Sequence, residues 1–275
     1  MNPHAAHPVS LSALVDSVWR NRQLIAQMTK REVVGRYRGS VLGIAWSLLN
    51  PMLLLAVYTF VFSVVFKARW NTGHESKMEF AIVLFAGLIV FGLFSECINR
   101  APGLILANPN YVKKMVFPLE IMPFVLLGVS TFHAVISFFV LLLVYFLTHH
   151  MLHWTAIFLP VVLMPLVLIA LGLSWFLASL GVFLRDLGHA ILLLTTVLMF
   201  SSPVFYPITS LPEAFRKWLS LSPLAIAIEQ TRDVIIWGVT PDWRSLGVMT
   251  FVCFVFAWLG FIWFQKTRRD FSDVI

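Results

Sequence analysis

The chain has few charged residues: Asp, Glu, Lys and Arg together make up only 12% of its 275 residues. A soluble domain carries about a quarter of its residues in these four types. Hydrophobic residues account for 59%, and the mean hydropathy is +0.86. So few charges cannot cover the surface of a water-soluble globule. The composition therefore excludes that class and predicts a protein embedded in a membrane.

Common nucleotide-binding and catalytic sequence motifs are also missing. The sequence contains no Walker A or other Gly-rich phosphate loop, no HExxH and no GxSxG motif. Its two cysteines, Cys97 and Cys253, lack metal-ligand spacing, and His149, His150 and His153 have no acidic residue or cysteine nearby. We therefore expect neither a catalytic residue nor a metal site, and any energy for work must come from another subunit.

Residues 1–40 form a basic segment without the apolar core of a signal peptide, so we expect the first span to act as an uncleaved insertion signal. Within it, residues 11–30 place apolar side chains at helical period, with polar ones such as Asp16 and Gln23 on the other face. This pattern predicts an amphipathic helix in the plane of the membrane interface. A helix packed on a soluble partner is a compatible alternative.

Six apolar runs follow, and each is close to or longer than the ~20 residues that a bilayer-spanning helix needs. Together they define a transmembrane domain over residues 41–275 of an all-α polytopic protein. The predicted spans lie at about 41–66, 79–98, 121–148, 154–184, 187–206 and 246–264.

The distribution of Lys and Arg predicts the orientation. With the N-terminus inside, 13 of the 20 Lys and Arg residues fall on the inner side. Inner loops of membrane proteins carry such an excess, so we expect both termini in the cytoplasm. Topology also explains the net charge of +7 better than nucleic-acid binding does.

The segment 207–245 is too long for a turn and too apolar for a solvated loop, and four prolines interrupt it. Irregular backbone at membrane depth must be buried in protein or line a cavity. We therefore predict two short re-entrant helices on the outer side, at about 211–221 and 224–237. Charges at such depth are functional candidates. Glu229, Arg232 and Asp233 would either line the exit as an outer gate or staple the two helices together.

Three polar features lie nearer the inner side. Glu96 and Arg100 have the i,i+4 spacing of a local ion pair. His133, inside the third span, is expected to form a hydrogen bond between helices. The loop 99–120 combines amides, prolines and two lysines, and it would either dock in a cleft of a soluble partner or remain a solvated connection.

The basic stretch that enters the first span contains Arg36, Tyr37, Arg38, Ser40, Leu42, Gly43, Trp46, Leu49 and Pro51. These residues fit a pattern of a basic pair, then R-Y-R/K-x-S-x-L-G, then W-x-x-L-x-P. The stretch therefore resembles the start of the ABC-2-type polysaccharide export permeases, which share this pattern.

Two later segments resemble the same family. Residues 108–123 follow its N-x-x-L-I-K-K-x-x-F-P loop, with an acidic residue and a second proline after it, although Tyr111-Val112 replaces Leu-Ile. Residues 183–187 resemble its F-x-R-D turn, and residues 202–207 its S-P-I-x-Y/F run. Ser222 stands where the family has Asn before Pro223. The resemblance covers nearly the full chain.

The resemblance implies a permease subunit that exports O-antigen, capsule or teichoic acid, with O-antigen favoured. It implies a homodimer in the bacterial cytoplasmic membrane, docked inside to two ATPase subunits that bind ATP and Mg, so that this chain needs no cofactor. The substrate would be a polyprenyl-linked polysaccharide. The residues expected to couple to the ATPase are Asn108, Asn110, Lys113, Lys114, Arg185 and Asp186.

Aromatic residues are abundant, with 25 Phe, 10 Trp and 5 Tyr. Most should face lipid or form interface belts. Sugar rings also stack on aromatic planes, which let a glycan slide without being held. The resemblance implies that spans one and five line the channel. The candidates there are Trp46, Tyr58, Phe200, Phe205 and Tyr206.

Two other functions remain open. An ABC-2 exporter of a small lipid or drug would share this architecture, although the polysaccharide-type motifs weigh against it. A membrane enzyme acting on lipid-linked sugars would need clustered acid/base or metal-binding residues, whereas the 13 acidic residues are scattered and form no DxD pair.

Overall fold

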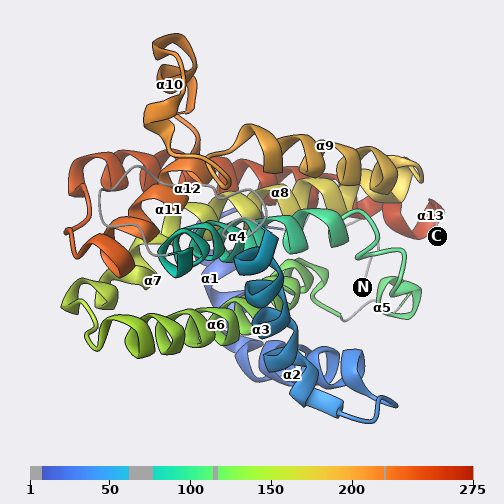
Figure 1. Ribbon diagram of the computed structural model, residues 1–275. Helices are drawn as coiled ribbons and strands as arrows, with labels where there is room; N and C mark the ends of the chain where they lie inside the picture. Colours follow the sequence, from blue (N-terminus) through green and yellow to red (C-terminus); the bar gives the residue numbers. More distant parts are fainter. Residues whose placement is uncertain (1–7, 62–76, 114–116, 220, 275) are drawn as a thin grey trace.

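The computed structural model describes residues 8–61, 77–113, 117–219 and 221–274, which form helices and connecting turns without a β-strand. The long helices lie side by side as a bundle (Figure 1). They are α4 (Lys77–Arg100), α6 (Met122–His149), α8 (Met164–Phe183), α9 (Leu187–Ser201) and α12 (Trp243–Thr267). The N-terminal helices are α1 (Leu11–Arg20), α2 (Arg22–Tyr37) and α3 (Trp46–Tyr58).

Five of the six predicted spans are confirmed as helical segments long and apolar enough to cross a membrane. They are Gly43–Val61, Met78–Arg100, Leu119–His149, Trp154–Phe183 and Trp243–Asp270. Residues 62–66 of the first predicted span lie outside the described residues. The run predicted at 187–206 contains a shorter apolar helix, α9, which ends at Ser201. Pro203 explains this end, because a proline disfavours helical geometry in the residue before it.

Helix α4 occupies the centre of the bundle. It contacts α3, α6, α8, α9 and α11 (Pro223–Arg232), and most of its residues are buried. Neighbours on every side explain why its sequence is apolar around the whole helix. By contrast, α3 buries only a narrow stripe that includes Ser47, Pro51 and Leu55.

Helices α8 and α12 approach each other most closely, at Gly172 and Gly260. A Cβ atom on Gly172 would lie 2.7 Å from Cα of Ala257, and one on Gly260 would overlap the carbonyl oxygen of Gly172. Small residues allow such backbone contact between membrane helices. The two helices therefore form a closely packed pair.

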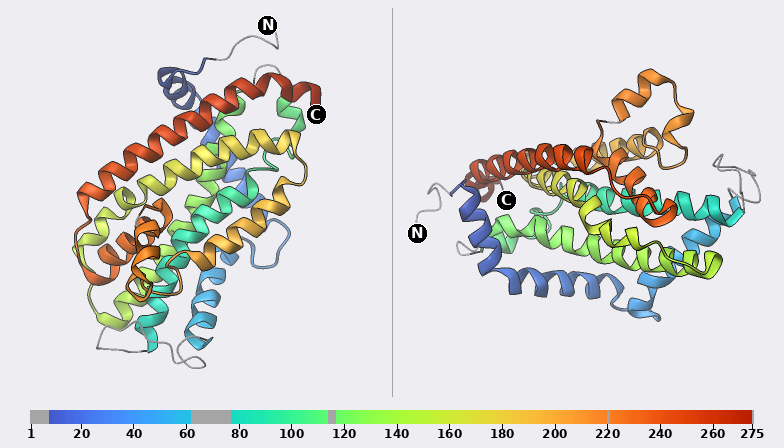
Figure 2. Two further views of the ribbon diagram at one scale, coloured as in Figure 1. Left: turned by 90° about the horizontal axis from the view of Figure 1, so that it is seen from above. Right: turned by 90° about the vertical axis from the view of Figure 1, so that its left-hand side faces the viewer.

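The helix predicted over residues 11–30 is divided at Asn21, so the prediction of one continuous helix is wrong. The amide of Asn21 donates to the carbonyl of Ser17, which ends α1 there. Helix α1 is the strongly amphipathic part, whereas α2 lies along the N-terminal half of α6 (Figure 2). Thr29 of α2 packs against Gly128 of α6, where a Cβ atom would lie only 2.8 Å from the threonine hydroxyl.

The ends of the bundle differ in their small elements. Helices α1, α5 (Pro109–Lys113) and α13 (Phe271–Val274) lie toward one end, which corresponds to the predicted inner side (Figure 2). The opposite end holds η4 (Trp154–Phe158), α7 (Leu159–Val162) and the π-helical turn η6 (Asp233–Trp237).

The segment 207–245 contains the two predicted short helices, α10 (Glu213–Leu219) and α11, which continues into η6. Helix α11 packs against α4 and α8, whereas α10 stands away from the bundle (Figure 1). Phe215 and Trp218 of α10 are exposed. The helices are therefore confirmed, while their re-entrant placement stays a prediction.

Candidate functional site

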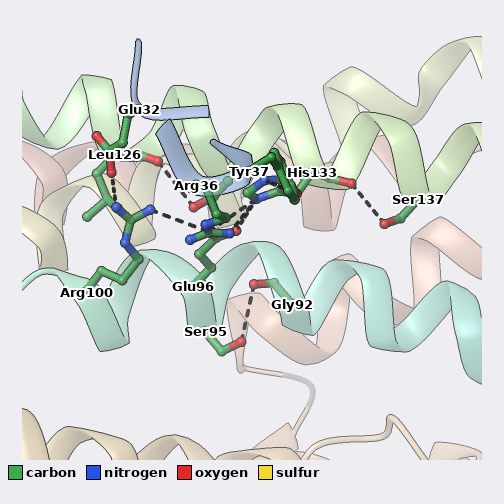
Figure 3. A network of polar contacts seen from close by, with 11 residues as sticks. Glu32, Arg36, Tyr37, Gly92, Ser95, Glu96, Arg100, Leu126, His133 and Ser137 are labelled. Atoms are coloured by element: carbon green, nitrogen blue, oxygen red, sulfur yellow. Dashed lines mark hydrogen bonds and ion pairs between the residues drawn. The ribbon is translucent and has the colours of Figure 1, made fainter. Parts of the chain in front are cut away.

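A polar network joins α2, α4 and α6 in the inner half of the bundle, with Glu96 at its centre (Figure 3). The carboxylate of Glu96 lies 2.7 Å from Nη2 of Arg36 and 2.9 Å from Nδ1 of His133. The predicted pair with Arg100 is present at 3.5 Å, and the predicted interhelical hydrogen bond of His133 is confirmed. Three helices therefore converge on one carboxylate.

Two further contacts strengthen the link between this network and α2. Arg100 pairs with Glu32, and the hydroxyl of Tyr37 lies 3.2 Å from Nε2 of His133. When Nδ1 of His133 donates to Glu96, Nε2 is left as an acceptor for Tyr37. Burial raises the pKa of the Tyr37 phenol, partly offset by Arg36, so the hydroxyl keeps its proton. We call these six residues the Glu96 network: Glu32, Arg36, Tyr37, Glu96, Arg100 and His133.

A cavity of about 360 Å³ lies between α3, α4 and α6 and reaches the Glu96 network. Its inner end is lined by Arg36, Tyr37 and His133, and the remainder is mostly apolar. Tyr58 of α3 also faces this cavity, so it points between helices of the same chain.

A second cavity, of about 600 Å³, lies at the inner end of the bundle. Residues from α2, α4, the 101–108 turn and the start of α9 surround it. Its polar lining residues are Arg31, Glu32, Asn99, Arg100 and Asn108. This cavity brings together segments that are far apart in the sequence, and the hydroxyl of Tyr111 accepts a hydrogen bond from Arg31 at 2.8 Å beside it.

The predicted coupling residues lie around or near this inner cavity. Asn108 lines it and donates to the carbonyl of Leu104 at 3.0 Å, while Asn110 is exposed on α5. Arg185 and Asp186 are exposed in the turn between α8 and α9, two residues before the lining residue Gly188. Lys114 and the side chain of Lys113 lie outside the described part of the chain.

Glu120 forms a separate junction at the inner end. Its carboxylate accepts from the hydroxyl of Ser17 at 2.8 Å and from Arg268 at 2.5 Å. Its backbone carbonyl accepts from the indole of Trp175 at 3.1 Å, and Arg268 also donates to the carbonyl of Phe117. One acidic residue thus ties α1, α8 and the turn η7 (Arg268–Asp270) after α12 to the segment that precedes α6.

Arg232 is the centre of the outer cluster, and its side chain is only 1% exposed. Its guanidinium donates to the carbonyls of Val83 in α4 and of Pro203 and Val204 after α9, at 2.7–3.1 Å. Its ion pair with Glu229, at 2.9 Å, lies within α11. The predicted gate residue Arg232 therefore anchors α11 to two neighbouring segments, while Asp233 is half-buried at the start of η6.

The predicted channel aromatics fall into two groups. Phe200 and Phe205 stack with ring centroids 5.5 Å apart, and the hydroxyl of Tyr206 donates to the carbonyl of Ser201 at 2.8 Å. These three side chains gather where α9 ends. Trp46 and Tyr58 instead mark the two ends of α3.

Several residues of these sites could not be found from the sequence. Glu32 and Arg36 meet partners 68 and 60 residues away, and Arg268 lies 148 residues from Glu120. The spacing of these residues in the sequence does not indicate that they pair. The acidic residue after the Phe117-Pro118 motif was the one available signal. Within the described ranges, no group of three or more possible metal-ligating side chains occurs.

Comparisons with known proteins agree with this architecture. A sequence profile described as "ABC-2 type transporter" matches residues 23–236. The O-antigen export system permease protein RfbA of Myxococcus xanthus is 26% identical over 264 residues, which cover 95% of this chain and 99% of the relative. A Klebsiella pneumoniae protein of the same name is 25% identical, covering 92% and 95%. The polysialic acid transport protein KpsM of Escherichia coli is 25% identical, covering 87% and 91%.

Proposed function

This chain belongs to the ABC-2 type transporter family, and on that premise we propose that it is the transmembrane subunit of an ATP-driven exporter of a lipid-linked polysaccharide, with O-antigen as the favoured glycan. The carrying observation is the collinear similarity to permeases named for O-antigen export, which spans 95% of this chain. The relatives are named as permease or transport proteins, which supports a non-enzymatic subunit.

We propose that a separate ATPase subunit binds ATP and Mg and docks at the inner end. The geometry that supports this docking is the convergence of α2, the 101–108 turn and the start of α9 around the 600 Å³ cavity. Because α2 is linked to α4 and α6 through the Glu96 network, a partner that displaces α2 would pull on two spans. Asn108, Asn110, Arg185 and Asp186 are the described candidates for that contact.

We further propose that the glycan path lies between two copies of the chain. The centre of one copy is occupied by α4, whose core residues are fully buried, so a path through the protomer would have to displace it. We assign the second copy to the faces of α3 and α9, where Leu53, Val57, Leu193 and Val197 are exposed. Trp46 and the cluster at the end of α9 would then lie along the path.

In the proposed orientation both termini are cytoplasmic, the chain crosses the bacterial cytoplasmic membrane several times, and α10 and α11 lie on the outer side. The distribution of Lys and Arg supports this orientation. The carbonyl contacts of Arg232 favour its role as an anchor for α11 over a role in lining the exit.

The proposal is tested by tagging the chain in its native host and purifying it with the ATPase encoded by a neighbouring reading frame. We expect a stable complex that hydrolyses ATP, and we expect deletion of the gene to remove the surface polysaccharide. An intact surface glycan together with no ATPase association would overturn the proposal. A changed drug susceptibility with unchanged surface glycan would instead assign the small-molecule alternative.

A further inference from the structure

The 360 Å³ cavity between α3, α4 and α6 has two chemically different ends. Arg36, Tyr37 and His133 surround its inner end. Toward the outer side its walls are Leu54, Leu88 and other apolar side chains. Along α4 the lining extends from Glu96 to Phe85, which is about 16 Å at ~1.5 Å per residue. An amphiphilic molecule would therefore fit this cavity, with its polar head at the inner end and its apolar tail along the apolar walls.

Hydrogen-bond capacity remains at the polar end. The side chain of Arg36 is 41% exposed, and within the described residues it uses its two Nη atoms for contacts with Glu96 and His133. A guanidinium has five N–H donors, so several are available to an incoming ligand. Asn50 of α3 adds an exposed amide at the same cavity.

The serine hydroxyls and the carboxylate of the lining are already engaged in contacts within the protein. The hydroxyls of Ser47, Ser130 and Ser137 each donate to a carbonyl three or four residues earlier in the chain. The carboxylate of Glu96 is the acidic group of the lining, and it is already surrounded by Arg36, Arg100 and His133. The polar end therefore offers donors, which suits an anion.

Exchange of partners within the Glu96 network would make room for that anion. If Arg36 turns from Glu96 to a ligand phosphate, Glu96 keeps contacts with His133 and Arg100. Neither carboxylate nor guanidinium is then left unpaired, so the exchange avoids the cost of an isolated charge in a poorly solvated place.

From these features we propose that this cavity binds the phosphate-bearing end of a lipid, with the phosphate on Arg36 and one hydrocarbon chain along Leu54, Tyr58 and Leu88. The inference rests on the proposed function, because the lipid carrier of an exported glycan is one source of such a ligand. Bulk anionic phospholipid is the other source. A volume near the lower end of the ~300–1,000 Å³ typical of ligand sites suits one chain better than two.

Gly92 offers a direct way to close the cavity. It lines the cavity, and a Cβ atom on it would meet nothing within 4 Å, so Gly92→Leu fills space without a clash at the backbone. Gly247→Leu is the matched control, because Gly247 of α12 also has open space around its Cα but does not line the cavity. Arg36→Gln removes the phosphate partner, and Arg38→Gln controls for loss of one nearby positive charge.

The experiment measures binding of geranylgeranyl diphosphate to the complex with its ATPase in lipid nanodiscs, by native mass spectrometry. Geranylgeraniol tests the need for phosphate, and phosphatidylglycerol is added as a competitor. We expect the diphosphate to bind at least about tenfold more tightly than the alcohol, because charge-assisted hydrogen bonds to Arg36 are among the strong ones. Gly92→Leu should weaken both ligands, and Arg36→Gln should remove the preference for the diphosphate.

Equal binding of diphosphate and alcohol, or unchanged binding in Gly92→Leu, would overturn the inference. If phosphatidylglycerol competes fully, the site is a lipid-phosphate site supplied by bulk lipid; if it does not compete, the isoprenoid carrier is the source. A complex that exports glycan but binds no probe refutes this inference alone. A complex that binds the probe while deletion of the gene leaves the surface glycan intact refutes the proposed function alone.

Discussion

Two charge clusters of the chain, the Glu96 network and the outer cluster of Glu229 and Arg232, are built in different ways. In the Glu96 network the side chains of Glu32 and Arg100 are each 33% exposed and that of Arg36 is 41% exposed, and most members have more than one charged or polar partner. The outer cluster has one guanidinium, that of Arg232, which is almost fully buried and donates mainly to backbone carbonyls.

The difference indicates different mechanical roles. Contacts between half-exposed charges cost little to exchange, because solvent and a second partner replace what is lost. A buried guanidinium bound to carbonyls has no such substitute, and separating it leaves several polar groups unpaired. We therefore interpret the outer cluster as a fixed anchor and the Glu96 network as a releasable link between α2 and the bundle.

The largest expected effect is that of Arg232→Ala. This change leaves the carbonyls of Val83, Pro203 and Val204 without their donor in a buried place. We expect a loss of about 4 kcal/mol, or roughly 10 °C in Tm for a chain of this size, measured by thermal unfolding of the purified complex. The exposed Arg244→Ala serves as control. Equal Tm shifts for Arg232→Ala and Arg244→Ala would contradict the interpretation of the outer cluster as a fixed anchor.

Two glycines of α4 provide the next test. A Cβ atom on Gly87 would lie 2.7 Å from Nη2 of Arg232, whereas one on Gly92 would meet open space. Gly87→Ala should destabilise the protein by about 1–3 kcal/mol through overpacking against the anchor. Gly92→Ala should stabilise it by up to about 1 kcal/mol through helix propensity. Thermal unfolding of both variants checks the sign, and shifts of the same sign would contradict the anchor geometry.

Glu96→Gln should have a smaller effect that depends on salt. The substitution keeps the shape of the side chain but removes the charge that Arg36 and His133 face. We expect a loss of about 1 kcal/mol at low ionic strength, shrinking toward zero near 1 M salt because screening is then strong. Thermal unfolding across a salt series measures it. Arg232→Ala should show no such dependence, and a salt-independent loss in Glu96→Gln would argue against a releasable link.

The smallest effect is expected for Tyr37→Phe, which removes one hydroxyl from the network. Its contact with His133 is 3.2 Å long and only half-buried, so the loss should be at most about 0.5–1 kcal/mol. The informative measurement is the coupling energy from a double-mutant cycle with His133→Ala, since residues in contact or in one hydrogen-bond network give a non-additive result, whereas independent sites add. Strict additivity would show that the hydroxyl does not bind the imidazole.

Much of the helix inventory could be predicted from the sequence, because hydropathy reports how long an apolar run is. Hydropathy does not show which faces of the helices pack against one another. Helices α10 and α11 were both predicted from one apolar, proline-rich segment, yet Trp218 of α10 is 77% exposed while Arg232 of α11 is buried. A hydropathy scale ranks these two side chains in the opposite order.

The local polar contacts were predictable, and the long-range ones were not. The pair of Glu96 with Arg100 follows from helical spacing, and an apolar span explains why His133 needs a partner. That Arg36 completes the site depends on α2 lying along α6, which the pattern of residues 11–30 did not indicate. The break at Asn21 was the missed element, because it separates the amphipathic helix from the helix that docks.

The short α9 has a consequence for the surrounding lipid. Its 15 residues span about 22 Å, whereas the hydrocarbon layer is about 30 Å thick. If α9 is the fifth span, as the sequence predicts, the bilayer beside the proposed glycan path must thin, or the turn after Ser201 must take the place of a missing helical turn. A local hydrophobic mismatch of this kind makes transport sensitive to acyl-chain length. Lipids with shorter acyl chains should favour the conducting complex.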